Sequence, residues 1–286
     1  MEIAKLITQS SPDRSNRLTN GQAERVETYL RNFGYLDDVT DPIAELPNRI
    51  KAAQQVLNLP EDGEVGERTY KAMLTTPRCG CPDVVRSRAE AKRMNQWFRR
   101  KAKEGLTYHV IGYVKGLSEA LQEEIYIRAW TSWENVCGLN MIRKRDENAD
   151  IIIDASASQR EEFGSAGNVL AWAYLPRGDQ HTRQLLMKMD LAENWIDDPR
   201  QRGILMENVA CHEFGHLLGL NHTQIAGELL FPTYDRQVSK PQRRYDIPQV
   251  VKRYDEPTGT DKKQGEPDVS GTITIDGFAY QLQRWH

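Results

Sequence analysis

The stretch HEFGHLLGLNH at residues 212–222 decides how this chain of 286 residues can be interpreted. His212 and His216 are four residues apart, so in a helix both imidazoles leave the same face. Gly219 lets such a helix end and the chain turn, which can bring His222 back toward the first two histidines. Three neutral imidazoles leave the fourth position of a tetrahedral metal open, as in a catalytic rather than a structural zinc site.

Glu213 follows the first of these histidines, where it can hold and deprotonate a water molecule on the zinc. The alternative is an ordinary core helix that happens to carry histidines, because a bare H-E-x-x-H pattern is short. The full pattern fixes five positions in eleven, and three of the six histidines fall within it. We therefore expect a zinc centre with Glu213 as the general base.

The composition excludes several other classes of protein. A net charge of −3 gives no preference for nucleic acid or anionic membranes, and no apolar run approaches the length of a membrane span. Four cysteines are too few for a disulfide scaffold, and we expect Cys137 and Cys211 to be small buried hydrophobic residues. The first residues form no recognisable secretory signal. Export by another route, removal of a leader and retention inside the cell all stay open.

Apolar periodicity predicts three short helices at 20–33, 45–58 and 66–75, which together form a small bundle. The basic stretch 86–105 is either a solvated helix or a linker, and we place a domain boundary there. Beyond it the pattern predicts strands at 106–114, 149–155, 167–176 and 185–190, and helices at 118–136, 202–218 and 247–254. Residues 271–283 alternate around Asp276-Gly277, which predicts a hairpin that either packs on the body or serves as an interaction arm.

The stretch PRCGCPDV at residues 77–84 raises a separate question, because it places two cysteines around one glycine. We expect that a pair at this spacing does not readily close on itself as a disulfide. A thiolate in such a loop is, however, a strong ligand for a zinc ion with an open position.

The full zinc pattern is the signature of the metzincin endopeptidases, and the chain resembles their matrixin branch, the matrix-metalloproteinase-like enzymes. The resemblance covers about residues 20–255 and rests on PRCGCPDV, GNVLAWAY (167–174) and PTY (232–234) beside the zinc pattern. It implies an α+β fold. A three-helix, peptidoglycan-binding-like prodomain precedes a catalytic domain with a twisted, mostly parallel five-stranded sheet and three helices. We expect a propeptide at 1–85, an activation linker at 86–104, a catalytic domain at 105–256 and a tail at 257–286.

By this resemblance the protein is a latent zinc-dependent endopeptidase that hydrolyses peptide bonds of proteins. The ligands of one catalytic zinc would be His212, His216 and His222, with Cys79 in the fourth position until the propeptide is removed. The resemblance further implies a monomer, an activating protease, and an extracellular or cell-envelope location. The implied switch loop comprises Pro77, Arg78 paired with a carboxylate, Gly80, Pro82 and Asp83. The implied substrate edge strand comprises Val169, Leu170 and Ala171. The implied wall of the specificity pocket comprises Pro232 and Tyr234.

The chain departs from the family pattern at several positions. Leu230 stands where the family has a methionine beneath the zinc, and leucine keeps its volume and hydrophobicity. Trp172 and Lys188 stand at positions of the structural zinc, so we expect no such zinc, and we expect the unpaired His181 to lie on the surface.

Two further departures leave alternatives open. Asp190 and Glu193 only partly echo the family's calcium ligands, so calcium is possible, and solvated loop carboxylates are the other interpretation. Cys81 is unusual between glycine and proline: it is inert, pairs with another chain, or competes as a zinc ligand. Other functions for the whole chain are a peptidoglycan or cell-wall binding protein, or a proteolytically silent zinc-binding interaction protein.

Overall fold

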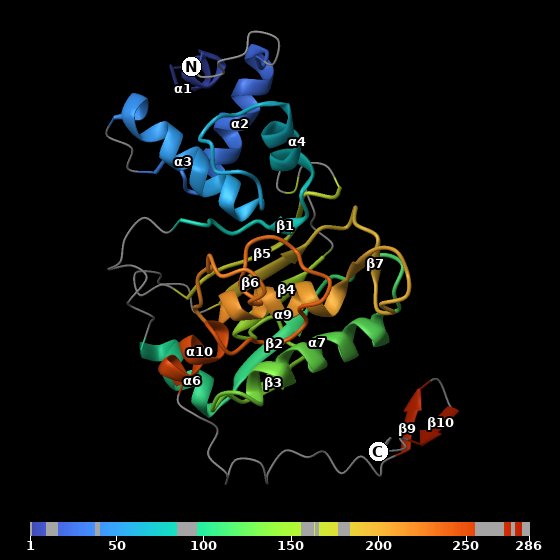
Figure 1. Cartoon of the computed structure of the whole chain (residues 1–286). Helices are drawn as coiled ribbons and strands as arrows, with labels where there is room; N and C mark the ends of the chain where they lie inside the picture. Colours follow the sequence, from blue (N-terminus) through green and yellow to red (C-terminus); the bar gives the residue numbers. More distant parts are fainter. Residues whose placement is uncertain are drawn as a thin grey trace.

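The computed structural model describes residues 2–9, 17–37, 41–84, 96–155, 163, 166–176, 184–254, 272–275 and 278–281. A helical bundle from the N-terminal part sits over one edge of a sheet that belongs to the following domain (Figure 1). The segment that joins the bundle to this sheet is β1 (Arg78–Cys79). Within the described residues, none of the helices is both long and apolar enough to cross a membrane.

The bundle consists of α1 (Glu2–Gln9), α2 (Asn20–Asn32), α3 (Pro42–Val56) and α4 (Glu67–Thr75). The three helices predicted in this region are confirmed, whereas α1 was not predicted. A capping box fixes the start of α2, because the side chains of Thr19 and Gln22 each bond the backbone N–H of the other residue. The apolar faces of these helices form a core of their own that includes Val26, Leu30, Ile50 and Met73.

The second domain is built on a six-stranded sheet with the order β1-β5-β6-β4-β2-β3. Its own five strands are β2 (Leu106–Val110), β3 (Met141–Arg143), β4 (Ile151–Asp154), β5 (Val169–Ala173) and β6 (Leu185–Met189). All described neighbours in this sheet run parallel except β5 and β6. The prediction of a mostly parallel five-stranded sheet is therefore confirmed for this domain. The sixth strand, β1, comes from the N-terminal segment and pairs parallel with β5.

Two helices, α7 (Glu119–Glu134) and α9 (Met206–Leu217), lie side by side against the sheet (Figure 1). Their shared core contains Trp130 stacked on Phe214, with ring centroids 3.6 Å apart. The indole N–H of Trp133 also donates to the Cys211 carbonyl at 2.9 Å, which holds α7 to α9. This packing places the helix that carries the zinc pattern across the middle of the domain.

The remaining described elements are the helices α6 (Gln96–Glu104) and α10 (Asp246–Tyr254) and two small two-stranded sheets. The parallel pair is β7 (Trp195–Ile196) with β8 (Ile204–Leu205), and the antiparallel pair is β9 (Thr272–Ile275) with β10 (Phe278–Gln281). Helix α6 occupies part of the basic stretch, for which helix and linker were both considered. The predicted tail hairpin forms, and the packing of its side chains lies outside what the structure describes.

Candidate zinc centre and its occluding loop

The three histidines converge because α9 ends in a tight glycine turn. Gly219 has a φ of +86°, which favours glycine. Its N–H bonds the His216 carbonyl at 2.8 Å, and the Leu220 N–H bonds the Gly215 carbonyl at 3.0 Å. These two bonds form a Schellman motif that reverses the chain. The reversal carries His222 back toward the helix face that bears the other two histidines.

The Nε2 atoms of the three imidazoles lie 3.1–3.2 Å from one another. Each Nδ1 faces an oxygen instead: the Leu229 carbonyl at 2.6 Å for His212, the Leu220 carbonyl at 2.8 Å for His216, and Asp83 at 3.1 Å for His222. An Nδ1–H that donates to a backbone carbonyl, as in His212 and His216, leaves the Nε2 lone pair free. Three Nε2 atoms therefore converge on one spot, an arrangement that a cation between them would stabilise.

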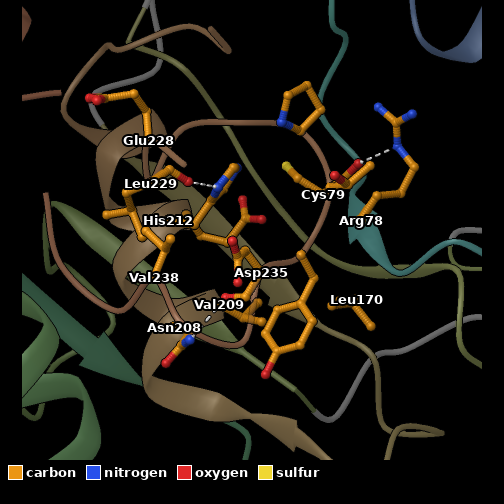
Figure 2. A pocket seen from close by; sticks show the side chains of 14 residues that line it. Arg78, Cys79, Leu170, Asn208, Val209, His212, Glu228, Leu229, Asp235 and Val238 are labelled. Carbon is orange, nitrogen blue, oxygen red and sulfur yellow. Dashed lines mark hydrogen bonds between the residues drawn. The ribbon is translucent and has the colours of Figure 1, made fainter. Parts of the chain in front are cut away.

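The donor set and its spacing fit zinc. Nitrogen ligands about 2.0–2.1 Å from a tetrahedral zinc are separated by about 3.3–3.4 Å, close to the spacing of the three Nε2 atoms. The Cys79 sulfur lies 3.5 Å from the His216 Nε2, and sulfur with nitrogen around such a zinc would be about 3.5–3.6 Å apart. Cys79 with the three histidines forms a group whose ligand atoms are all within 4.8 Å of each other. In Figure 2 the Cys79 side chain points toward His212.

The segment around Cys79 is held between two walls of the second domain. On one side, the Arg78 N–H donates to the Asn168 carbonyl and the Gly80 N–H to the Ala171 carbonyl, both at 2.8 Å. On the other side, the Cys79 N–H donates to the Pro232 carbonyl at 3.0 Å, and the Tyr234 N–H to the Pro77 carbonyl at 2.8 Å. The edge strand that was predicted to receive substrate, Val169 to Ala171, is therefore paired with the loop itself.

A buried ion pair fixes this loop from behind. The Arg78 guanidinium is fully buried and donates to the Asp83 carboxylate at 2.5 Å. It also donates to the Tyr29 hydroxyl, and its Cζ lies 3.4 Å from the ring centroid of Phe33. The predicted partner of Arg78, a carboxylate, is thus placed within the same loop.

Asp83 links this ion pair to the histidines. Its carboxylate accepts the Tyr35 hydroxyl at 2.5 Å and faces His222 at 3.1 Å. Burial by itself would raise the pKa of Asp83, but the Arg78 charge and the contact with His222 lower it to about 2. The carboxylate is consequently ionised, and one group both locks the loop and orients a ligand.

The remaining groups of the centre are deeply buried. Burial lowers the pKa of His212 and of His222, which keeps both imidazoles neutral. Burial raises the pKa of Glu213 to about 8 and that of the Cys79 thiol above its ordinary value. A thiolate at Cys79 therefore needs a cation beside it.

Leu230 is buried beneath α9, as expected for the residue that replaces the family's methionine. A Cβ added at Gly215 would lie 2.8 Å from a Leu230 methyl group and 2.9 Å from the Trp133 ring. The turn around Leu230 is held by Asp246, whose carboxylate accepts the N–H groups of Leu229 at 2.7 Å and of Leu230 at 3.2 Å. The floor of the centre is thus close-packed and fixed by α10.

A narrow cavity of about 30 Å³ adjoins His212 and Cys79. Pro232 and Tyr234, the predicted wall residues, line it. The Tyr234 hydroxyl accepts the Leu205 N–H at 3.0 Å, which ties the wall to the start of α9. The apolar residues Leu170, Val209, Leu229 and Val238 also line this cavity (Figure 2).

At the positions where the family binds its structural zinc and its calcium, this chain carries other residues or only some of the expected carboxylates. Trp172 and Lys188 are paired across β5 and β6, with the Lys188 Nζ 5.6 Å from the Trp172 ring centroid. His181 lies outside the described residues. Asp190 accepts the Ala192 N–H at 2.8 Å, and Glu193 accepts the Gly167 N–H at 2.5 Å. Burial raises the pKa of both carboxyls, and whether they hold calcium stays a prediction.

The comparisons with known proteins agree with this geometry. The matrixin family matches residues 96–254, and a putative peptidoglycan binding domain matches residues 19–73. Mouse matrilysin is 31% identical over 229 residues, which cover 77% of this chain and 80% of that protein. The chain belongs to the matrixin family. Matrix metalloproteinase-18 of Xenopus laevis is 29% identical over 257 residues, covering 85% of this chain and 51% of that protein.

This matrixin is a zinc-dependent endopeptidase with an N-terminal domain of the peptidoglycan-binding type. The predictions of family, fold class, enzymatic activity and catalytic zinc are confirmed. The family match begins at the first residue of α6, inside the segment expected to be the activation linker. The domain boundaries and the roles of individual residues remain predictions.

Sequence reasoning missed several groups that shape the site of this matrixin. Tyr29 and Tyr35 hold the Arg78–Asp83 pair from a helix and a turn of the bundle, and no local pattern pointed to them. Asp246 was not singled out, although an acidic residue at the start of a helix is a recognisable signal. Competition for the zinc was one of three interpretations of Cys81, and its closeness to Glu213 and His216 was not specifically predicted.

Proposed function

We propose that this matrixin is a zymogen in which Cys79 completes the zinc site and Glu213 is the catalytic base once Cys79 has left. The observation that carries the proposal is the convergence of three Nε2 atoms with the Cys79 sulfur beside them. His212, His216 and His222 would hold the zinc. Zinc bound by three imidazoles supplies Lewis acidity toward a carbonyl oxygen and lowers the pKa of a water molecule.

The chain's own contribution to hydrolysis is positioning and proton transfer. A Glu213 carboxylate oxygen lies within 4.8 Å of the Cys79 sulfur and of a His216 ring nitrogen. It would take a proton from the attacking water and deliver that proton to the nitrogen of the leaving amine. Because Cys79 occupies the same space, the base cannot meet a water molecule there while the loop is docked.

Substrate would replace the loop along the sheet edge. Val169, Leu170 and Ala171 offer backbone groups that β1 now uses, and an extended peptide can pair with the same groups. The wall formed by Pro232 and Tyr234 would receive one side chain of the substrate. Main-chain pairing carries little sequence information, so proteins with exposed extended segments are the expected substrates.

Activation would require removal of the segment that carries Cys79. We infer cleavage somewhere in 85–105, where the basic composition suits a trypsin-like protease. The predicted domains are a propeptide at 1–85, a linker at 86–104 and a catalytic domain at 105–256. We further infer a monomer that acts outside the cell or in the cell envelope, in line with relatives named matrix metalloproteinases.

The test is hydrolysis of a generic quenched peptide before and after limited trypsin treatment. We expect a large increase after cleavage and loss of the activity with a chelator. Equal rates before and after trypsin, or activity that resists the chelator, would contradict the proposal. Metal analysis should find one zinc per chain, whereas two would overturn the expectation that Trp172 and Lys188 replace the structural zinc.

A further inference from the structure

Cys81 has no task in the proposed function, yet it is buried beside the zinc centre. Its sulfur, the Cys79 sulfur, a Glu213 oxygen and a His216 ring nitrogen all lie within 4.8 Å of one another. The Cys81 N–H donates to the Cys79 sulfur at 3.2 Å, and the Cys81 thiol donates to the Ala173 carbonyl at 3.2 Å. The second thiol of the loop is therefore held next to the first.

Cys81 also borders a space that the zinc ligands do not reach. A cavity of about 530 Å³ lies between the bundle and the end of β5. Its volume falls in the range of sites that bind small molecules. Tyr174 on its wall is 48% exposed, so the cavity borders solvent. Cys81 shares the lining of this cavity with Phe33, Gly80, Pro82, Trp172, Ala173 and Tyr174, among others.

We propose that Cys81 is a thiol–disulfide exchange site, at which a small disulfide of the glutathione type converts Cys79 and Cys81 into a disulfide and frees the zinc's fourth position. The inference rests on the proposed function, because it requires Cys79 to be the zinc ligand in the latent enzyme. It gives the chain a route out of latency that needs no cleavage. The Cys81 thiol is the entry point because it lines the cavity, whereas Cys79 faces the histidines.

The chemistry consists of two balanced exchanges. In the first, the Cys81 sulfur attacks one sulfur of the small disulfide, the S–S bond breaks, and the Cys81 proton passes to the departing thiolate. In the second, the Cys79 thiolate attacks the Cys81 sulfur, and the second small thiolate leaves and takes a proton from water. Two cysteine thiols are oxidised and one small disulfide is reduced to two thiols. The Cys79 sulfur loses its negative charge and with it its affinity for zinc.

Gly80, between the two cysteines, lets the loop lie close against β5 and so keeps both thiols beside the centre. A Cβ at Gly80 would lie 2.8 Å from a Val169 methyl carbon and 3.2 Å from the Trp172 Cβ, so a side chain there would push the loop off β5. A disulfide between residues two apart is strained, and strained disulfides are readily reduced. The proposal departs from the expectation that this pair does not readily close: an excess of the small disulfide drives closure, and a dithiol reverses it and restores latency.

The experiment uses the intact protein with cobalt in place of zinc, because thiolate bound to cobalt gives a charge-transfer absorption in the near ultraviolet. We expect this absorption in the reduced protein and its loss on addition of oxidised glutathione. Intact mass should fall by two hydrogen atoms without a retained glutathionyl group, and a dithiol should restore both signals. An absorption that persists under oxidised glutathione, with unchanged mass, would overturn the inference.

Three variants locate the two exchanges, each measured by intact mass after oxidised glutathione. Cys79→Ser should stop after the first exchange and retain one glutathionyl group on Cys81. Cys81→Ser should keep its mass and, with cobalt, its absorption. Cys137→Ser, the matched control, should behave as the wild type, because Cys137 is buried elsewhere with its thiol on the Trp133 carbonyl. Adducts on Cys81→Ser, or none on Cys79→Ser, would contradict the assigned order.

The same measurement separates this inference from the proposed function. If the reduced protein lacks the thiolate absorption, Cys79 is not a ligand and the proposed latency fails. If the absorption is present and oxidised glutathione leaves it unchanged, the latency stands and only the exchange at Cys81 fails. A melting temperature equal to that of the wild type verifies that each serine variant is folded.

Discussion

The two halves of the zinc centre are built in different ways. The histidine half comes from one stretch of chain, and a glycine turn, two backbone carbonyls and the packed Leu230 fix it. The thiol half comes from a segment more than a hundred residues earlier, and a few backbone bonds and one buried ion pair hold it. The histidine half is therefore fixed by local contacts, whereas the thiol half depends on contacts between distant segments, which the proposed release of the loop after cleavage would break.

The largest expected effect is the loss of peptide hydrolysis when Glu213, the proposed base between the two halves, is replaced. Glu213→Gln keeps the size of the side chain and removes its ability to take a proton. We expect the trypsin-treated variant to lose about 10²–10⁴-fold in peptide hydrolysis, which is the usual contribution of general acid–base catalysis. Zinc content should stay at the wild-type level. A variant that keeps full activity would show that Glu213 is not the base.

The loop that carries Cys79 should undock from the histidines when the Arg78–Asp83 ion pair is removed. Arg78→Leu leaves the buried Asp83 carboxylate without its partner, and loss of one partner of a buried pair costs about 3–5 kcal/mol. We expect the uncleaved variant to hydrolyse the quenched peptide well above the wild-type background.

The matched control for this variant is Arg49→Leu in the bundle. Arg49 pairs with Glu45 where both side chains are 31% exposed, and such a surface pair contributes about 0–1 kcal/mol. The control should remain latent. Equal latency of Arg78→Leu and Arg49→Leu would mean that the buried pair does not hold the loop.

The histidine half should be weakened by overfilling its floor. Gly215→Ala places a methyl group within 3 Å of Leu230 and Trp133, and overpacking of this kind costs about 1–3 kcal/mol. Gly21→Ala is the matched control, because no atom lies within 4 Å of its added Cβ at the start of α2. Thermal unfolding should show a lower midpoint for the first variant and an unchanged or higher one for the second. A Gly215→Ala protein as stable as the wild type would show that the floor has room.

The smallest effect should come from restoring the family's residue beneath the zinc. Leu230→Met conserves volume, and such exchanges usually cost less than about 1.5 kcal/mol. We expect nearly wild-type zinc retention during titration with a chelator. A large loss of zinc would indicate that the leucine is specifically adapted to Gly215 and Trp133.

The same contrast explains what the sequence could predict. The spacing of His212, His216 and His222 follows from helix geometry and one glycine turn, so the histidine half was predictable residue by residue. The identity of the thiol followed from the family resemblance. The contact of Asp83 with His222 and the hydroxyl groups of Tyr29 and Tyr35 on the ion pair join distant segments, and no local pattern encodes them.

The sheet shows the same limit. Four strands of the second domain followed from apolar patterning, but β3, β7 and β8 were not predicted. The strand β1 is only two residues long and forms because β5 offers a free edge. The closeness of Cys81 to Glu213 and His216 likewise depends on how that loop docks. Short elements that form only through tertiary pairing cannot be predicted from the periodicity of apolar residues in the sequence.

The central claim is that Cys79 supplies the fourth zinc ligand until the loop leaves. X-ray absorption at the zinc edge tests it on the intact and the trypsin-treated protein. The account predicts a sulfur neighbour at about 2.3 Å in the intact protein and only nitrogen or oxygen neighbours at about 2.0–2.2 Å after cleavage. An intact protein whose zinc has no sulfur neighbour would contradict it.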